Sequence, residues 1–285
     1  MDNETLALVL ILASAIFHAS WNIVLKSATD KFAVTIWLGI MGAVLVLPGL
    51  YWVGWPEPAV LPWILISITI HVVYQFSLQK SYDVAPFSVI YPISRGTGPM
   101  IVAFFGAMLL GDQLTMLGFV GVALISFGIL SMTRPEPNEL QHPEKLFKHV
   151  LMALGLGLMI GTYTLIDASG VRAGTTPFNF IVWGNILYAT AYTALGIFKR
   201  RGLLISDLRA SAKVGLSVGI VANSGYIMAL LAFNYGVVGE IAALRELSII
   251  FAALFGYLFL SEKIGMRRIR AAVIITVGTI VLKGF

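Results

Sequence analysis

The chain has 285 residues, of which 58% are hydrophobic and only 12% are charged, and its formal net charge is +5. Its mean hydropathy of +0.90 lies outside the range of soluble globular domains, in which about one residue in four is charged. The lack of cysteine excludes disulfides and thiolate metal sites. The basic residues stand singly between apolar runs, which argues against nucleic-acid binding. We therefore expect an integral membrane protein.

Ten apolar runs are long enough to form membrane-spanning helices, which need about 20 residues to cross a hydrocarbon core of about 30 Å. In chain order, the predicted spans are 6–25, 32–53, 60–79, 86–110, 116–132, 149–167, 177–198, 214–235, 238–260 and 269–283. The segment before the first run contains Asp2 and Glu4 but no basic residue. We therefore expect a retained helix there and not a cleavable signal peptide.

Basic residues gather in alternate connections between the predicted spans. The connections after odd-numbered spans, with the first residues that follow them, contain Lys26, Lys31, Lys80, Arg134, Lys145, Lys148, Lys199, Arg200, Arg201, Arg209, Lys213, Lys263, Arg267, Arg268 and Arg270. The other connections and the chain ends contain only Arg172 and Lys283. Because positively charged loops stay on the cytoplasmic side, we expect both termini to lie outside the cytoplasm.

Two long stretches of the sequence share one plan: a charged middle, small and aromatic residues, a short acidic turn and a closing helix with spaced glycines. They begin with "APFSVIYPISRGTG" and "YGVVGEIAALRELS". Arg95 and Arg245 lie 150 residues apart, and so do Asp112 and Glu262, which we interpret as loop anchors at the ends of their helices. This pattern indicates a duplicated five-helix unit.

The two predicted repeats comprise residues 1–132 and 149–285, and a cytoplasmic linker at 133–148 joins them. Because five is an odd number, the second repeat must enter the membrane from the opposite side, so the repeats are inverted. Many secondary transporters have inverted repeats, with the substrate bound near the midplane and exposed to each side in turn. Channels can also be built in this way, so the repeat alone does not separate the two classes.

Three short motifs point to a family: "HASWNIVLK" in the first span, and "LLGDQL" and "FLSEKIG" at the ends of the fourth and ninth. With ten helices in two repeats, the chain resembles the drug/metabolite transporter superfamily, specifically its EamA-type members. The branch of bacterial aromatic amino-acid and methyl viologen exporters is one candidate neighbour in this resemblance. It implies a multi-pass protein of the bacterial inner (plasma) membrane, with a central cavity lined mainly by the third, fourth, eighth and ninth helices.

The resemblance does not extend to one coupling mechanism of the superfamily. Its small multidrug members have a proton-coupling glutamate in the middle of the first helix. Here that helix offers His18 and Asn22 but no acid. Their coupling mechanism therefore cannot be carried over to this chain.

Charged residues occur deep in two predicted spans. Arg95, next to Tyr91, lies about nine residues or roughly 13 Å into the fourth span, close to the midplane. Arg245 lies in the ninth span, with Glu240 and Glu246 beside it. A charge at the bilayer centre costs at least ~2.5–3.5 kcal/mol, so such residues usually face a bundle interior or a wet cavity and have a partner.

Three interpretations of these four charges are open. In the first, the two arginines and the two glutamates, whose formal charges sum to zero, pair with one another and only lock helices together. In the second, at least one arginine binds a carboxylate or phosphate of the substrate, for which its planar fork of donors is suited. In the third, Glu246 or Glu240 takes up and releases a proton during transport.

The segment "YPISRGTGP" around Arg95 contains Pro92, Gly96, Gly98 and Pro99. This combination kinks or locally unwinds helices, and interrupted helices at membrane depth often mark a transporter site. Alternatively, the two glycines allow a close contact between helices. The matching segment of the second repeat, "ALRELSII", has neither proline nor glycine, so any unwinding would be confined to the first repeat.

Polar residues also follow two other spans at helical spacing: His71, Tyr74 and Gln75 in the third, and Asn223 and Tyr226 in the eighth. Such a stripe either lines a substrate cavity or forms interhelical hydrogen bonds. The first interpretation makes all five candidate substrate-binding residues. Tyr91 would add a ring that stacks on an aromatic or cationic ligand.

No metal-binding pair, P-loop or nucleophile elbow occurs in the sequence. We therefore predict a monomeric secondary active transporter without a cofactor, whose partners are the lipid bilayer and a small-molecule substrate. The expected activity is export of small amphipathic metabolites such as amino acids, including aromatic ones, with a site near Arg95 and Arg245. Export of lipophilic cations or drugs is the alternative, and a passive channel or an intramembrane enzyme are the competing classes.

Overall fold

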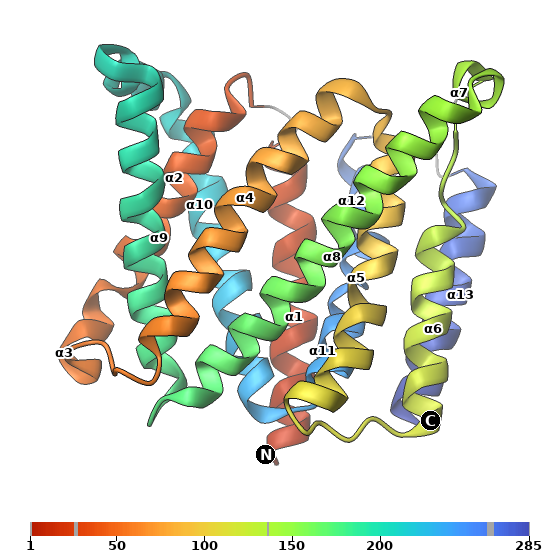
Figure 1. Ribbon diagram of the computed structural model, residues 1–285, viewed down its shortest axis with the longest axis horizontal. Helices are drawn as coiled ribbons and strands as arrows, with labels where there is room; N and C mark the ends of the chain where they lie inside the picture. Colours follow the sequence, from red (N-terminus) through yellow and green to blue (C-terminus); the bar gives the residue numbers. More distant parts are fainter. Residues whose placement is uncertain (1, 26–27, 136, 261–264, 285) are drawn as a thin grey trace. The chain divides into compact units, whose positions relative to one another are not determined.

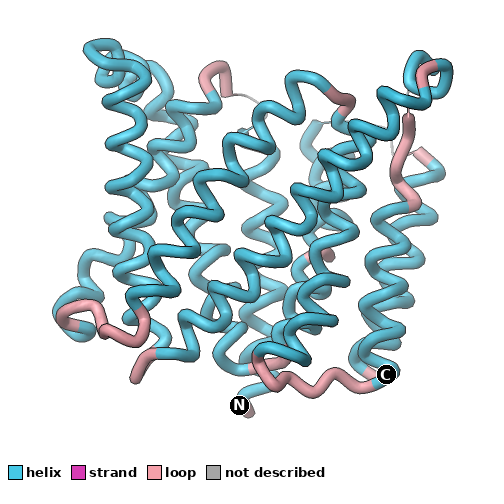
Figure 2. Tube along the Cα trace, in the orientation of Figure 1, coloured by secondary structure: helices cyan, strands magenta, loops and turns pink. Residues whose placement is uncertain are grey.

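The computed structural model of the protein describes residues 2–25, 28–135, 137–260 and 265–284 (Figure 1). Its helices are α1 (Asn3–Leu25), α2 (Lys31–Val46), η1 (Leu47–Gly49), α3 (Leu50–Val53), α4 (Leu61–Val84), α5 (Phe87–Leu109), α6 (Met116–Leu130), α7 (Pro137–Gln141), α8 (Pro143–Ala173), α9 (Pro177–Arg200), η2 (Arg201–Leu203), α10 (Leu204–Tyr235), α11 (Val238–Arg245), α12 (Ser248–Leu260) and α13 (Met266–Lys283). Short loops join them, and the described residues form no strand (Figure 2). The predicted all-α fold is confirmed.

Seven segments of the described chain are long and apolar enough to cross a membrane: Asn3–Asn22, Lys31–Val53, Leu61–Val84, Pro143–Ala173, Pro177–Arg200, Leu204–Tyr235 and Val238–Leu258. The helix α6 is a shorter apolar helix. Two helices begin earlier than predicted, α8 at Pro143 and α10 at Leu204. Hydropathy detects only the apolar part of a helix, so it missed their polar first turns.

The helices form two compact units, and each unit takes segments from both halves of the sequence. Unit 1 comprises Met1–Ile68, Asp167–Tyr235 and Ser248–Glu262. Unit 2 comprises Thr69–Ile166, Gly236–Leu247 and Lys263–Phe285. The predicted repeats are a division by sequence similarity, which this division by contacts does not test.

In unit 1, α10 packs against α1 and α2, and α2 packs against α9; Figure 1 shows α2, α9 and α10 side by side. The close approach of α10 and α2 depends on glycine. A Cβ at Gly215 would lie 2.3 Å from the Trp37 ring, and one at Gly219 would lie 2.7 Å from Met41. The indole of Trp37 also donates a hydrogen bond to the carbonyl of Leu208 (2.9 Å).

In unit 2, α6 packs along α13 (Figure 1), and α5 packs against α6 and α11. The helices α6 and α13 approach each other closely because each contributes a glycine to the contact. A Cβ at Gly121 would lie 2.6 Å from the backbone of Leu282, and one at Gly278 would lie 2.8 Å from the backbone nitrogen of Ile125. The spaced glycines of these helices are therefore packing residues.

The predicted unwinding in "YPISRGTGP" is wrong, because α5 is a continuous helix from Phe87 to Leu109 with Pro92 and Pro99 inside it. Pro92 lacks the N–H group that would bond to the carbonyl of Ser88. That carbonyl instead accepts a hydrogen bond from the backbone N–H of Arg134 (3.1 Å). A neighbouring segment thus replaces the bond that proline removes.

The alternative interpretation of the glycines in α5, close helix contact, is confirmed. A Cβ at Gly96 would lie 2.8 Å from Leu130 at the end of α6, and one at Gly98 would lie 2.8 Å from Ile160 of α8. These two glycines let α6 and α8 approach the buried part of α5 closely.

The helix interruption lies in the second half of the chain, in "ALRELSII", where none was predicted. The helix α11 ends at Arg245, and α12 begins at Ser248. The N–H groups of Glu246 and Leu247 bond to carbonyls three residues earlier, at 3.0 and 3.1 Å. The regular ladder is therefore interrupted at Glu246 without any proline or glycine.

Candidate functional site

A buried ion pair in unit 2 joins Arg95 of α5 to Glu246 in the break between α11 and α12. The Nη2 atom of Arg95 lies 2.9 Å from Oε1 of Glu246, and their side chains are only 8% and 4% exposed. An unpaired charge at this depth would be costly. The pair therefore explains why an apolar segment can contain Arg95.

The hydrogen-bonding capacity of this pair is only partly used. Among the described residues, Nε of Arg95 and Oε2 of Glu246 are buried and have no hydrogen-bond partner, and the same is true of Nε of Arg245. Buried polar groups are almost always satisfied by protein, water or ligand. These atoms thus retain unused hydrogen-bonding capacity, both as donors and as an acceptor.

Three tyrosines lie near the guanidinium group of Arg95. It interacts electrostatically with the phenol groups of Tyr91, Tyr163 and Tyr74. The His71 ring stacks on Tyr163 at a centroid distance of 4.2 Å, and Tyr74 meets Tyr163 edge-on at 5.5 Å. The site therefore combines two opposite charges with several ring surfaces.

Most of the predicted site residues lie in unit 2. The charge of Arg245 interacts with Glu246, and Gln75 is half-buried next to Tyr74 in α4. Glu240 does not join this group, because its Oε2 lies 2.8 Å from Nζ of Lys283. The four charges therefore do not all pair with one another.

The other two predicted site residues, Asn223 and Tyr226 of α10, lie in unit 1. The amide nitrogen of Asn223 donates hydrogen bonds of 2.7 Å to the carbonyls of Leu38 in α2 and Gly219 in α10. This geometry fits the interpretation of Asn223 as a link between helices. The predicted polar residues of α4 therefore belong to unit 2, and those of α10 belong to unit 1.

Tyr226 leads to a buried carboxylate that the sequence analysis did not identify as a site residue. Asp167 of α8 is 1% exposed. Its Oδ2 accepts a hydrogen bond from the hydroxyl of Tyr226 (2.8 Å), and its Oδ1 accepts one from the hydroxyl of Ser67 (2.5 Å). The signal was present, since Asp167 follows the apolar run "TYTLI" and α8 continues to Ala173.

Asp112 follows α5 and bonds to the start of another helix: its Oδ2 accepts a hydrogen bond of 2.7 Å from the backbone N–H of Val238, the first residue of α11. A carboxylate there also favours the positive end of the helix dipole. Its counterpart Glu262, and the loop residues Lys26 and Lys263, lie outside the described residues. Where side chains are described, no group of three or more His, Asp and Glu could hold a metal ion.

Comparison with known proteins gives evidence at the level of family and fold. Residues 147–283 match the model of the EamA-like transporter family. One solved crystal structure is similar over 96% of this chain and 95% of its own, with a TM-score of 0.75 and 15% sequence identity, which shows a shared fold. No curated protein matches the chain significantly. The second half of this multi-pass membrane protein is therefore similar to the EamA-like transporter family, which is part of the drug/metabolite transporter superfamily.

Proposed function

We propose that the protein is a secondary active transporter that exports small amphipathic metabolites, amino acids first among them, across the bacterial inner membrane by alternating access. The observation that carries this proposal is the buried, incompletely hydrogen-bonded pair of Arg95 and Glu246. It lies at an interrupted helix, a feature that secondary transporters use at their substrate sites.

An amino-acid zwitterion matches the chemistry of this pair. Its carboxylate can take the free donor of Arg95, because a guanidinium fork suits carboxylates. Its ammonium group can take the free Oε2 of Glu246. The rings of Tyr74, Tyr91 and Tyr163 offer surfaces for an apolar or aromatic side chain.

The first test is counterflow in proteoliposomes that contain the full chain. Vesicles are preloaded with a panel of unlabelled amino acids, and the entry of labelled phenylalanine and threonine is followed without an imposed gradient. Transient accumulation is the expected result for a carrier. Equal entry into preloaded and empty vesicles would indicate a passive channel and contradict the proposal.

Charge-neutral variants separate a substrate-binding role of the pair from a purely structural one. Arg95→Gln or Glu246→Gln alone leaves one buried charge unpaired, which costs about 3–5 kcal/mol of stability. The double variant Arg95→Gln/Glu246→Gln removes both charges, so we expect stability near that of the wild type but no counterflow. Normal counterflow by the folded double variant would assign the pair to helix locking.

The ion pair of Glu240 and Lys283 provides a matched control in the same unit. Glu240→Gln/Lys283→Gln removes the same two charges, and we expect it to retain counterflow. Loss of transport in both double variants would mean that unit 2 tolerates no charge removal, and would contradict a specific role for Arg95.

Lipophilic cations remain the second substrate class, favoured by the free Oε2 of Glu246 close to the Tyr91 ring. The same vesicles distinguish the two classes. Counterflow of labelled methyl viologen without any counterflow of amino acids would support lipophilic cations as the substrate class. In that case, we expect that Arg95→Gln does not selectively reduce methyl viologen counterflow.

A further inference from the structure

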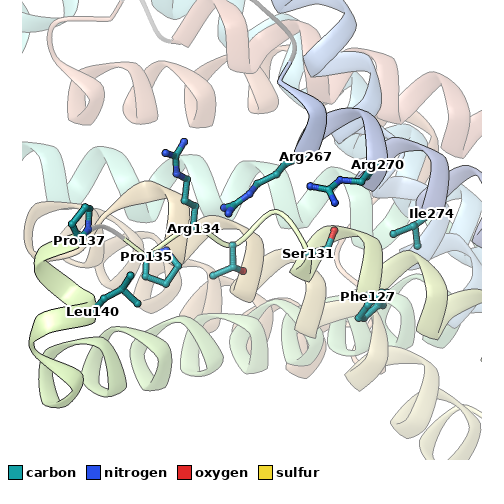
Figure 3. A pocket seen from close by; sticks show the side chains of 10 residues that line it. Phe127, Ser131, Arg134, Pro135, Pro137, Leu140, Arg267, Arg270 and Ile274 are labelled. Atoms are coloured by element: carbon teal, nitrogen blue, oxygen red, sulfur yellow. The ribbon is translucent and has the colours of Figure 1, made fainter.

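Unit 2 contains a cavity of about 640 Å³ where the chain leaves α6 and where α13 begins. Three arginines line it, Arg134 from the segment after α6 and Arg267 and Arg270 from α13. Figure 3 shows the side chains of Arg267 and Arg270 extending from α13 toward the segment that carries Arg134. All three residues are exposed, so a ligand can reach them.

Among the side chains that the structure describes, no carboxylate lies within ion-pair distance of Arg134, Arg267 or Arg270. Like charges around one cavity repel each other. Two of them also lie in the first turns of α13, where the positive end of the helix dipole disfavours cations. Gly265, the N-cap residue, has no side chain to accept from the free N–H groups there. A bound anion would relieve all of these effects.

The backbone holds one of these arginines in place. The N–H group of Arg134 donates to the carbonyl of Ser88 (3.1 Å), and its carbonyl accepts from the hydroxyl of Ser88 (2.7 Å). Nearby, Oγ1 of Thr133 is buried and has no hydrogen-bond partner among the described residues. The cavity thus combines an arginine whose backbone is anchored with an unused hydroxyl donor.

We propose that this cavity binds a phosphate group, and that the phosphate belongs to an anionic membrane lipid. Guanidinium groups bind phosphate oxygens in a bidentate manner. The exposed apolar side chains of Phe127 and Leu140 border the same cavity, and they offer a surface for acyl chains that a free phosphate ion would not use. Basic pockets beside membrane helices are suited to lipid head groups.

The test uses the full-length protein in nanodiscs of phosphatidylcholine with increasing fractions of phosphatidylglycerol. Bound lipid is counted by native mass spectrometry after release from the discs. Arg134→Gln/Arg267→Gln/Arg270→Gln should weaken phosphatidylglycerol binding by about 100-fold, since each basic residue near an anionic surface contributes about five-fold. Thr133→Val, which keeps every charge, should weaken it by a smaller factor.

A matched control removes three exposed cations of unit 1, in Arg201→Gln/Arg209→Gln/Lys213→Gln. We expect this variant to retain phosphatidylglycerol at the cavity. Equal binding by both triple variants, each with an unfolding midpoint close to that of the wild type, would overturn the proposal.

Soluble phosphate distinguishes the two sources of the anion. If inorganic phosphate or glycerol 3-phosphate at millimolar concentration leaves phosphatidylglycerol bound, the lipid is the ligand. If either compound displaces it, and binds to the wild type but not to the arginine variant, the phosphate site stands but its lipid source is overturned.

Discussion

At the scale of single residues, substitution of the buried Asp167 tests how much its hydrogen bonds stabilise unit 1. Asp167→Ala leaves the hydroxyls of Ser67 and Tyr226 without their acceptor. Tyr226→Phe removes one hydrogen bond to a charged group, which typically contributes about 1.5–3 kcal/mol. We expect Asp167→Ala to lower the free energy of unfolding in detergent by more than Tyr226→Phe does. If Asp167→Ala unfolded at the same denaturant concentration as the wild type, these hydrogen bonds would contribute nothing.

The sequence indicated some site residues and not others for a physical reason. Arg95 and Glu246 stood out because a charge within an apolar run needs a partner. Which of the nearby acids is that partner could not be predicted, since Glu240 and Glu246 differ only in the neighbours that folding brings to them. Asp167 went unnoticed as a site residue because hydropathy placed the end of a span at that position.

At the scale of helices, glycine contacts between α6 and α13 give a prediction with an internal control. A Cβ at Gly121 would meet backbone atoms of Leu282 at 2.6 Å, which cannot move aside as a side chain can. We expect Gly121→Ala to lower the free energy of unfolding by about 1–3 kcal/mol. Gly155→Ala in α8, with no neighbouring atom within 4 Å, should instead raise it by about 0.5–1 kcal/mol. If Gly121→Ala and Gly155→Ala changed the free energy of unfolding equally in urea titrations, the result would contradict a stabilising role of the close contact between α6 and α13.

The two halves of the chain also show where sequence rules for helices fail. Proline and glycine predicted an interruption in α5, yet Arg134 supplies the missing hydrogen bond and the helix continues. The segment at Glu246 contains no helix breaker, yet α11 ends there. In both places local composition fails to predict the helix, and at Ser88 a contact distant in sequence supplies the missing hydrogen bond.

At the scale of the whole molecule, the sequence predicted the all-α fold well because about 20 apolar residues per span leave few alternatives in a membrane. The division into two units that each combine both halves of the chain was not predicted. Periodicity and repeats report similarity between segments. They do not report which helices pack against each other.

The predicted inverted topology can be tested directly, because the chain contains no cysteine and each introduced thiol is therefore unique. Ala59→Cys and Ala210→Cys lie at exposed positions in corresponding connections of the two predicted repeats. Inverted repeats place them on opposite sides of the membrane, and the distribution of basic residues places Ala59 outside and Ala210 in the cytoplasm. A membrane-impermeant maleimide should thus label Ala59→Cys in intact cells and Ala210→Cys only after permeabilisation. Labelling of both from the same side would contradict the inverted repeat, whereas the reverse pattern would retain the repeat and reverse only the orientation.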